Sequence, residues 1–292
     1  MTIDDWNPGI EAEIDDMYAA GISSFKMYMT YPAMMIGDEA MYHALKKLRE
    51  KGGICGVHCE NSGVIDALIA EKKAAGEMGV GSHPRTRPDF LEAEAVSRLL
   101  RIAQAVDIPV VIVHLTNAAA LREVEAARKR GQRVYVETCP QYLLLDDSVY
   151  DDPDYSRAAR YVCAPPIRKT EDQRVLWAAL RKGEIQTVST DHCSFTLEQK
   201  DAGRGDLPGS PAACRGWRPG ASCCIPTALP PGRSAGHHVP GAVGKPRQAL
   251  RYVPPEGRAP GRGRRGYRGV RSPGGPSAPG GGHDKSGGLH AV

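Results

Sequence analysis

Four short apolar runs, each with a polar side chain near its carboxyl end, constrain the fold of this chain more than any other feature. Segments of helical periodicity separate the runs, so strand and helix alternate along the chain. Parallel strands that present polar groups at their carboxyl ends are typical of the active face of an α/β barrel. We therefore predict that the four polar groups share one site. They are Lys26, His58, His114 and Asp191.

The other expected elements follow the same alternation. Strands are expected at 22–31, 53–61, 108–113, 133–138 and 187–195, and helices at 1–20, 38–52, 64–75, 92–105, 118–130 and 170–180. Right-handed crossovers between parallel strands make either a barrel or an open doubly wound sheet, and periodicity does not decide between them. The absence of a Gly-rich loop after a strand argues against a nucleotide-binding sheet.

Local signals define the ends of the helices. Asn117 is expected to cap the helix 118–130, and Gly183 is expected to end the helix that begins at Thr170. The sequence Thr170-Glu171-Asp172-Gln173 predicts a capping box at the start of that helix.

Burial can also be predicted for three segments. The continuous β-branched run 108–113 predicts a fully buried parallel strand, and the run 187–195 predicts a second buried strand. The stretch 76–88 is rich in Gly, Pro and Arg, which predicts a loop with His83 on the surface.

Composition changes sharply after Asp206, where most of the Gly and Pro residues lie and acidic residues nearly vanish. We predict two regions: a partial barrel at 1–206, and a disordered or out-of-frame Gly/Pro/Arg-rich tail at 207–292. The net charge of +4 comes from this tail. It is therefore not evidence for a nucleic-acid surface on the folded part, and nucleic acid is not an expected partner.

The cysteines and the hydropathy pattern indicate the cellular compartment of the protein. Eight cysteines without regular spacing, and no apolar segment long enough for a leader or a membrane span, predict reduced thiols in a cytoplasmic protein with no membrane partner. Five of them are expected to be buried as small apolar residues. They are Cys55, Cys59, Cys139, Cys163 and Cys193.

The four predicted site residues suit metal-assisted hydrolysis. His58 and His114 are ligands that zinc accepts, and Asp191 can serve as an oxygen ligand and a proton acceptor. A neutral Lys26 amine can take up CO2 and become a carbamate that bridges two cations. Two metal ions can then hold a hydroxide and direct it at a carbonyl carbon.

Six motifs occur in order along residues 1–206. They are Ser-Phe-Lys-Met-Tyr-Met-Thr-Tyr, Gly-Val-His-Cys-Glu-Asn, Val-His-Leu-Thr, Glu-Thr-Cys-Pro-Gln-Tyr-Leu, Cys-Ala-Pro-Pro and Thr-Asp-His-Cys-Ser-Phe. Together they resemble the dihydropyrimidinase and D-hydantoinase family of cyclic amidohydrolases. The resemblance implies about the second half of a (β/α)8 TIM-type barrel with a binuclear zinc site. It also implies a homotetramer that opens cyclic ureides or imides to N-carbamoyl amino acids.

Matching the motifs assigns a role to each residue. Lys26 would be the carboxylated lysine that bridges the metals, and His58 and His114 would bind one of them. Asp191 would bind the other metal and act as general base. Tyr31 would donate a hydrogen bond to the oxyanion. Cys163 and Ala164 would hold the substrate ring through their main chains.

The sequence departs from the family in two places. The family's His-x-His pair on the first barrel strand has no counterpart. In addition, Cys214-Arg215-Gly216-Trp217-Arg218, read one nucleotide earlier, permits Leu-Pro-Gly-Val-Glu, which resembles a substrate-binding segment of the family. Three alternatives stay open: an allantoinase or dihydroorotase-like enzyme, a non-catalytic scaffold relative, and an inactive remnant. Tyr31 after the lysine motif favours the hydantoinase branch.

Resequencing the gene tests the predicted out-of-frame tail. We expect one inserted or deleted base between the codons for Gly203 and Trp217, because only a frame change produces the family-like reading downstream. The measurement is the DNA sequence of this interval and of the region upstream of Met1. An unchanged frame would contradict the prediction.

Overall fold

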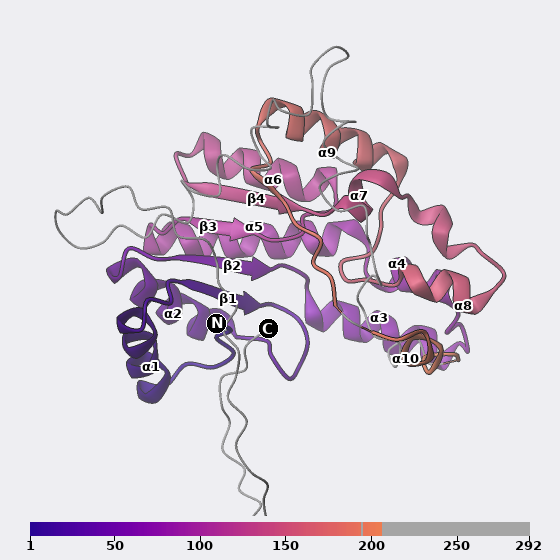
Figure 1. The fold of residues 1–292 in the computed structure, drawn as a ribbon, viewed down its shortest axis with the longest axis horizontal. Helices are drawn as coiled ribbons and strands as arrows, with labels where there is room; N and C mark the ends of the chain where they lie inside the picture. Colours follow the sequence, from indigo (N-terminus) through magenta and orange to yellow (C-terminus); the bar gives the residue numbers. More distant parts are fainter. Residues whose placement is uncertain (194, 206–292) are drawn as a thin grey trace, which may run out of the picture.

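A computed structural model describes residues 1–193 and 195–205. The predicted tail at 207–292 lies outside the described residues. In the described part, five parallel strands form one sheet in the order β1-β2-β3-β4-β5. Figure 1 labels β1 to β4 in this order. The strands are β1 (Ser24–Tyr28), β2 (Ile54–His58), β3 (Val110–Ile112), β4 (Val134–Thr138) and β5 (Thr187–Val188).

The strand order identifies the sheet as part of a barrel. Each strand pairs in parallel with the next one in the sequence, from β1 beside β2 to β4 beside β5. A doubly wound sheet reverses its strand order at a switch point, and this sheet shows no reversal over the described strands. The fold is therefore the partial α/β barrel that the motifs imply.

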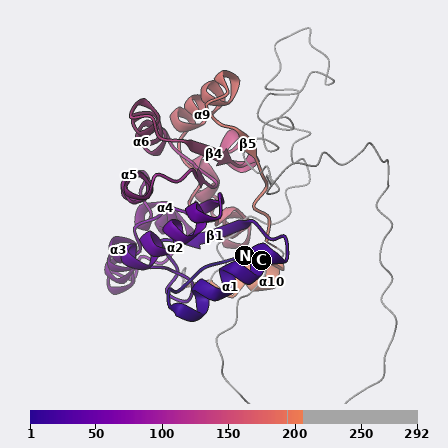
Figure 2. The same cartoon turned by 90° about the vertical axis from the view of Figure 1, so that its left-hand side faces the viewer.

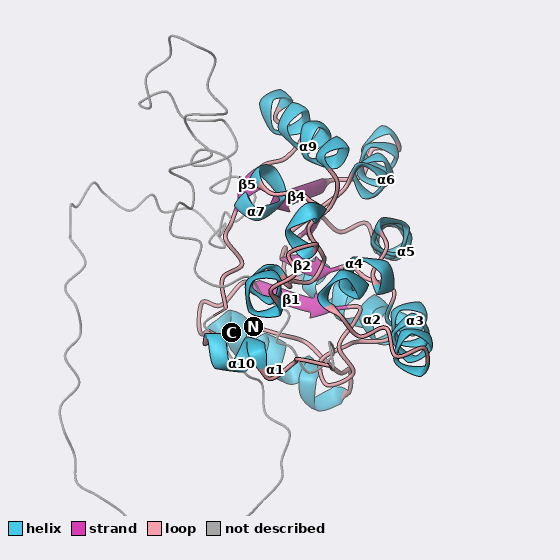
Figure 3. Cartoon of the chain, turned by 90° about the vertical axis from the view of Figure 1, so that its right-hand side faces the viewer, coloured by secondary structure: helices cyan, strands magenta, loops and turns pink. Residues whose placement is uncertain are grey.

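Helices cover one face of the sheet. Neighbouring helices α1, α2, α5, α6 and α9 pack against one another in that order, and α5 and α6 lie on one side of the strands (Figures 2 and 3). The longer helices are α1 (Pro8–Ala19), α2 (Asp38–Glu50), α3 (Ser62–Ala74), α5 (Asp89–Val106), α6 (Ala118–Lys129) and α9 (Thr170–Lys182). The shorter ones are α4 (His83–Thr86), α7 (Pro140–Leu144), α8 (Tyr155–Ala158) and α10 (Leu197–Asp201). Single 3-10 turns occur at Val80–Ser82, Asp147–Tyr150 and Ala159–Tyr161.

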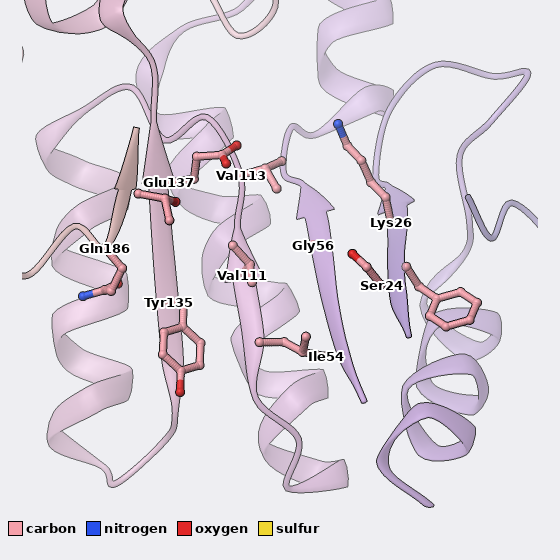
Figure 4. A pocket seen from close by; sticks show the side chains of 11 residues that line it. Ser24, Lys26, Ile54, Gly56, Val111, Val113, Tyr135, Glu137 and Gln186 are labelled. Atoms are coloured by element: carbon pink, nitrogen blue, oxygen red, sulfur yellow. The ribbon is translucent and has the colours of Figure 1, made fainter. Parts of the chain in front are cut away.

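The two faces of the sheet differ in burial. Side chains that face the helices form the core, and those that alternate with them line a hollow of ≈210 Å³ on the opposite face (Figure 4). The run 108–113 is therefore buried on one face only, which corrects the prediction of a fully buried strand: Val111 and Val113 line the hollow. The predicted buried strand 187–195 is also wrong. Only Thr187 and Val188 pair, and both are half-buried because β5 pairs with β4 alone among the described strands.

Several local predictions can be compared with the structure. Asn117 caps α6 by accepting a hydrogen bond from Ala120 N at 2.8 Å, and Gly183 ends α9 at φ 75°; both confirm the prediction. The capping box at Thr170 is wrong, because Lys169 is the N-cap and makes no side-chain cap bond. The Thr170 hydroxyl instead donates to Asp146 at 3.3 Å.

The amino-terminal segment also differs from its prediction. Helix α1 begins at Pro8, capped by Asn7, rather than at residue 1. Residues 1–3 extend the sheet instead: Ile3 N donates to the Lys26 carbonyl at 2.9 Å, and Lys26 N donates to the Met1 carbonyl at 2.8 Å. This contact supports the outer edge of β1, the strand that carries Lys26.

Four of the five cysteines expected inside the protein are buried, namely Cys55, Cys59, Cys139 and Cys163. Cys193 is only half-buried, because it lies in the loop after the edge strand β5. Among the described helices, none combines the length and the apolar composition that a membrane span requires.

Candidate active site

Two imidazoles form the centre of the site. His58 ends β2, and His114 lies two residues beyond the end of β3, so neighbouring strands place them side by side with ring centroids 4.4 Å apart. Each is 2% exposed. Burial lowers the pKa of both rings, and the neighbouring His58 lowers that of His114 further. Both rings are therefore neutral near pH 7, so each keeps a nitrogen lone pair for a metal ion.

Glu60 and Arg87 orient the His58 ring. His58 Nε2 lies 2.7 Å from Glu60 Oε2, and Arg87 Nη1 donates to the same oxygen at 2.8 Å. Burial would raise the pKa of Glu60, but Arg87 and His58 hold it well below its usual range. The ionised carboxylate can only accept, so His58 Nε2 carries the hydrogen and Nδ1 is the nitrogen available to a ligand.

Lys26 and Glu137 share the open face of the sheet. Both side chains line the hollow and lie toward the carboxyl ends of β1 and β4 (Figure 4). Lys26 Nζ lies 4.7 Å from the centroid of the Tyr28 ring. Gly56 is opposite Lys26 on β2, and a Cβ there would lie 3.0 Å from Val113, so glycine preserves the space beside the lysine. Burial, and then the charge of Asp191, raise the pKa of Glu137.

Tyr31 packs against the His58 imidazole from the loop after β1. Its ring meets the His58 ring edge to face at 5.1 Å, and the Arg87 guanidinium lies 5.8 Å from the Tyr31 centroid. The backbone of Tyr31 is left-handed, with φ 69°. Burial, and then Glu60, raise the pKa of the Tyr31 hydroxyl above its ordinary value. The hydroxyl therefore keeps its proton and can donate a hydrogen bond.

Asp191 lies at the edge of this group. It is exposed and left-handed, with φ 45°, in the loop that follows β5. Burial, and then the charge of Asp191, raise the pKa of Glu137 and Cys139, so Asp191 acts electrostatically on residues near the carboxyl end of β4. No group of three or more His, Cys, Asp or Glu side chains suited to a metal occurs in the part of the chain that the structure describes. The structure thus brings His58 and His114 together with Tyr31, and Asp191 does not join the two imidazoles in a metal-ligand group among the described residues.

The segment Cys163–Pro165 is supported from behind by a histidine. His83 Nε2 lies 2.6 Å from the Cys163 carbonyl, and the Tyr142 hydroxyl donates to the Pro165 carbonyl at 2.8 Å. His83 is 4% exposed, so its prediction as a surface residue is wrong. Burial, and then Arg87, lower its pKa to about 3. The neutral ring must donate through Nε2, because a carbonyl only accepts.

The sequence analysis missed four residues of this site: Glu60, His83, Arg87 and Glu137. Two of them had a usable signal. Glu60 lies two residues after His58, and Glu137 is near the carboxyl end of a predicted strand, where strand alternation places polar groups on one face. His83 and Arg87 lie in the stretch expected to be a surface loop, and no local pattern distinguishes them.

Comparisons with known proteins agree with this geometry. No protein-family model matches the chain. The chain is 39% identical over 209 residues to a D-hydantoinase of Streptomyces coelicolor, an alignment that covers 71% of this chain and 44% of that protein. The structure is similar to that of a D-hydantoinase from a Bacillus species, with a TM-score of 0.71, 38% identity and coverage of 73% and 47%.

A dihydropyrimidinase structure from Brevibacillus agri gives the same TM-score of 0.71, with 37% identity over 73% of this chain and 47% of that one. The chain therefore spans about half the length of the relatives it matches.

Proposed function

We propose that this chain, which belongs to the hydantoinase and dihydropyrimidinase family, carries part of a zinc site for opening cyclic amides. The reaction is hydrolysis of the ring amide bond of hydantoins or dihydropyrimidines, which gives N-carbamoyl amino acids. The observation that supports it most directly is the pair of buried, neutral imidazoles of His58 and His114, 4.4 Å apart at the carboxyl ends of adjacent strands.

The donor set suits zinc with three protein ligands. His58 through Nδ1, His114, and Lys26 after carboxylation by CO2 would hold one ion, with Lys26 bridging to a second ion held by Asp191. Bound zinc would lower the pKa of its water and polarise the substrate carbonyl. The fit is better for the first ion than for the second, because Asp191 stands apart from the imidazoles among the described residues.

The remaining roles concern binding and proton transfer. Tyr31 would donate its hydroxyl hydrogen to the oxyanion, since its raised pKa keeps it protonated. Asp191 would accept the proton of the attacking water and pass it to the leaving ring nitrogen. The main chains of Cys163 and Ala164 would hold the ring, and His83 fixes the Cys163 carbonyl from behind. The same proposal includes small cyclic ureides or imides as substrates, and a homotetramer in the cytoplasm as the family resemblance implies.

One observation favours a second candidate, which is zinc or ligand binding without turnover. The described residues bring together two imidazoles but no third His, Cys, Asp or Glu ligand. A chain of this kind would bind a single ion and open no ring. Measured zinc stoichiometry and ring opening therefore decide between the two candidates.

Zinc titration of the full chain gives the first test. We expect His114→Ala to lower zinc affinity by at least about 100-fold, because it removes one of the few ligands of the ion. The measurement is competition with a chromophoric chelator. The control is His43→Ala, since His43 stacks on Trp6, away from the imidazole pair.

Ring opening is then followed with hydantoin and dihydrouracil as the loss of ring absorbance. Turnover that depends on zinc and on Tyr31 supports the amidohydrolase. Zinc binding without turnover supports the second candidate. Equal zinc affinity in the wild type and in His114→Ala would show that the imidazole pair is not a metal site.

A further inference from the structure

We propose that Arg168 is a positioning residue that ties the carboxyl end of β2, where His58 lies, to the segment after β3 that carries His114. It does so through one continuous set of buried polar side chains, here called the buried polar chain. The inference rests on the proposed function, because it concerns the two imidazoles assigned there to zinc. The members of the buried polar chain are Glu60, Arg87, Arg168, Glu92, Thr116 and Asn117.

Arg168 occupies the centre of the buried polar chain. Its Nη1 donates to the Arg87 carbonyl at 2.5 Å, its Nε to Thr116 Oγ1 at 2.9 Å, and its Nη2 to Glu92 Oε2 at 3.1 Å. Its side chain is 7% exposed. All three guanidinium nitrogens thus contact different segments of the chain. The planar fork of arginine suits this arrangement, whereas the single nitrogen of lysine cannot spread to three such acceptors.

One arm of the chain reaches His114. Glu92 accepts from Thr116 N at 2.9 Å, from Asn117 Nδ2 at 2.7 Å, and from the Thr116 hydroxyl. Thr116 lies two residues after His114, whose backbone is left-handed with φ 39°. A residue with a Cβ adopts that conformation only when its surroundings impose it. The bonds to Glu92 and Arg168 hold the segment that follows His114.

The other arm reaches His58. Arg168 fixes the backbone of Arg87, the Arg87 guanidinium donates to Glu60, and Glu60 accepts from His58 Nε2. Each guanidinium group pairs with one carboxylate, Arg87 with Glu60 and Arg168 with Glu92, so the charges balance within the protein. An unpaired charge at this depth would be costly, so the members depend on one another. A change at Arg168 should therefore reach both imidazoles although it contacts neither.

The obvious alternative is that Arg168 only stabilises the fold. Arg128 is a matched control because it bonds in the same way at the other end of the sheet. It donates to the Val134 carbonyl at 3.0 Å, the Glu184 carbonyl at 2.8 Å and Gln186 Oε1 at 2.9 Å. Val134 begins β4, and Glu184 and Gln186 precede β5. The three acceptors therefore lie at the amino-terminal ends of these strands, remote from the imidazoles.

The test compares Arg168→Lys with Arg128→Lys in the full chain, using three measurements. They are the thermal midpoint, the imidazole ¹⁵N–¹H signals of His58 and His114 in metal-free protein, and zinc affinity by chelator competition. We expect both variants to lower the midpoint. Only Arg168→Lys should move the signals of both imidazoles and weaken zinc binding about 10- to 100-fold.

Should Arg168→Lys fail to fold, Thr116→Val removes the hydroxyl that accepts from Arg168 Nε and keeps the backbone bond to Glu92. It should move the signals of both imidazoles in the same sense. Unchanged signals in either folded variant, or a change at one imidazole alone, would overturn the inference. If wild-type protein binds no zinc, the proposed function fails, and the metal-free imidazole signals still decide the role of Arg168.

Discussion

The free energy of unfolding is expected to fall steeply as the pH drops from 6.5 to 5, because buried neutral histidines take up protons when the chain unfolds. Burial lowers the folded-state pKa of His58, His83 and His114 below the ordinary value. The unfolded chain therefore binds more protons than the folded chain in this window, so stability rises with pH up to about 6.5 and is lost below it.

His83 gives the size of the effect. Its pKa falls to about 3 in the folded state, so it stays neutral throughout the window. Below the ordinary histidine pKa it alone contributes roughly 1.4 kcal/mol per pH unit, or about 2 kcal/mol between pH 6.5 and 5. His58 and His114 add to this in the same direction. The buried carboxylate Glu60, whose pKa is also lowered, has linkage of the same sign, but its contribution is lost only below about pH 4.5 and so lies outside this window.

Urea denaturation at half-unit pH intervals measures this slope. The variant His83→Gln keeps an N–H donor for the Cys163 carbonyl and removes the titrating ring, so the slope should fall by roughly 1.4 kcal/mol per pH unit. The matched control is Tyr150→Phe. It removes the hydroxyl that accepts from Ile167 N beside His83, and should lower stability by the same amount at every pH. An unchanged slope in His83→Gln would show that the histidine is not held neutral.

The paired imidazoles could be predicted from the sequence, whereas the supporting residues His83 and Arg87 could not. Each imidazole follows a short apolar run, and parallel strands in sequential order bring such positions together without any long-range information. His83 and Arg87 depend on partners 80 and 27 residues away, the Cys163 carbonyl and Glu60. The polar composition of the stretch 76–88 predicts that it is exposed. Its polar side chains can be buried only because distant residues supply their hydrogen-bond partners.

Caps and edges show the same limit. Thr170 has the sequence of a capping box, yet its hydroxyl bonds to Asp146, 24 residues away, while a capping box forms at Thr196 and Gln199. Asp191 was expected beside the imidazoles because its run reads as a strand of nine residues. Only two of those residues pair, and the loop that follows leaves the carboxylate exposed. Local sequence patterns therefore predict the existence of helices and strands more accurately than they predict the residues at which these elements end.

Removing Glu60 is expected to be among the most destabilising single changes in the chain. Glu60 is 1% exposed and binds both the Arg87 guanidinium, at 2.8 Å, and the His58 ring, at 2.7 Å. Glu60→Ala leaves the Arg87 guanidinium buried without its carboxylate, which costs about 3–5 kcal/mol. Urea denaturation at pH 7.5 measures this loss. The control pair is Asp38 and Arg98, which lie 2.9 Å apart at the surface, where Asp38→Ala should cost less than about 1 kcal/mol.

A double variant separates the loss of attraction from the cost of an unpaired charge. Glu60→Leu combined with Arg87→Met removes both charges and keeps apolar volume, so it should be more stable than Glu60→Ala although it lacks more polar groups. A double variant that is less stable than the single one would show that Arg87 contributes independently of Glu60. The expected recovery would instead show that the Glu60–Arg87 pair contributes little net stability as a unit. The role of the pair would then be to orient His58, and the position of that ring in the metal-free protein should change in both variants.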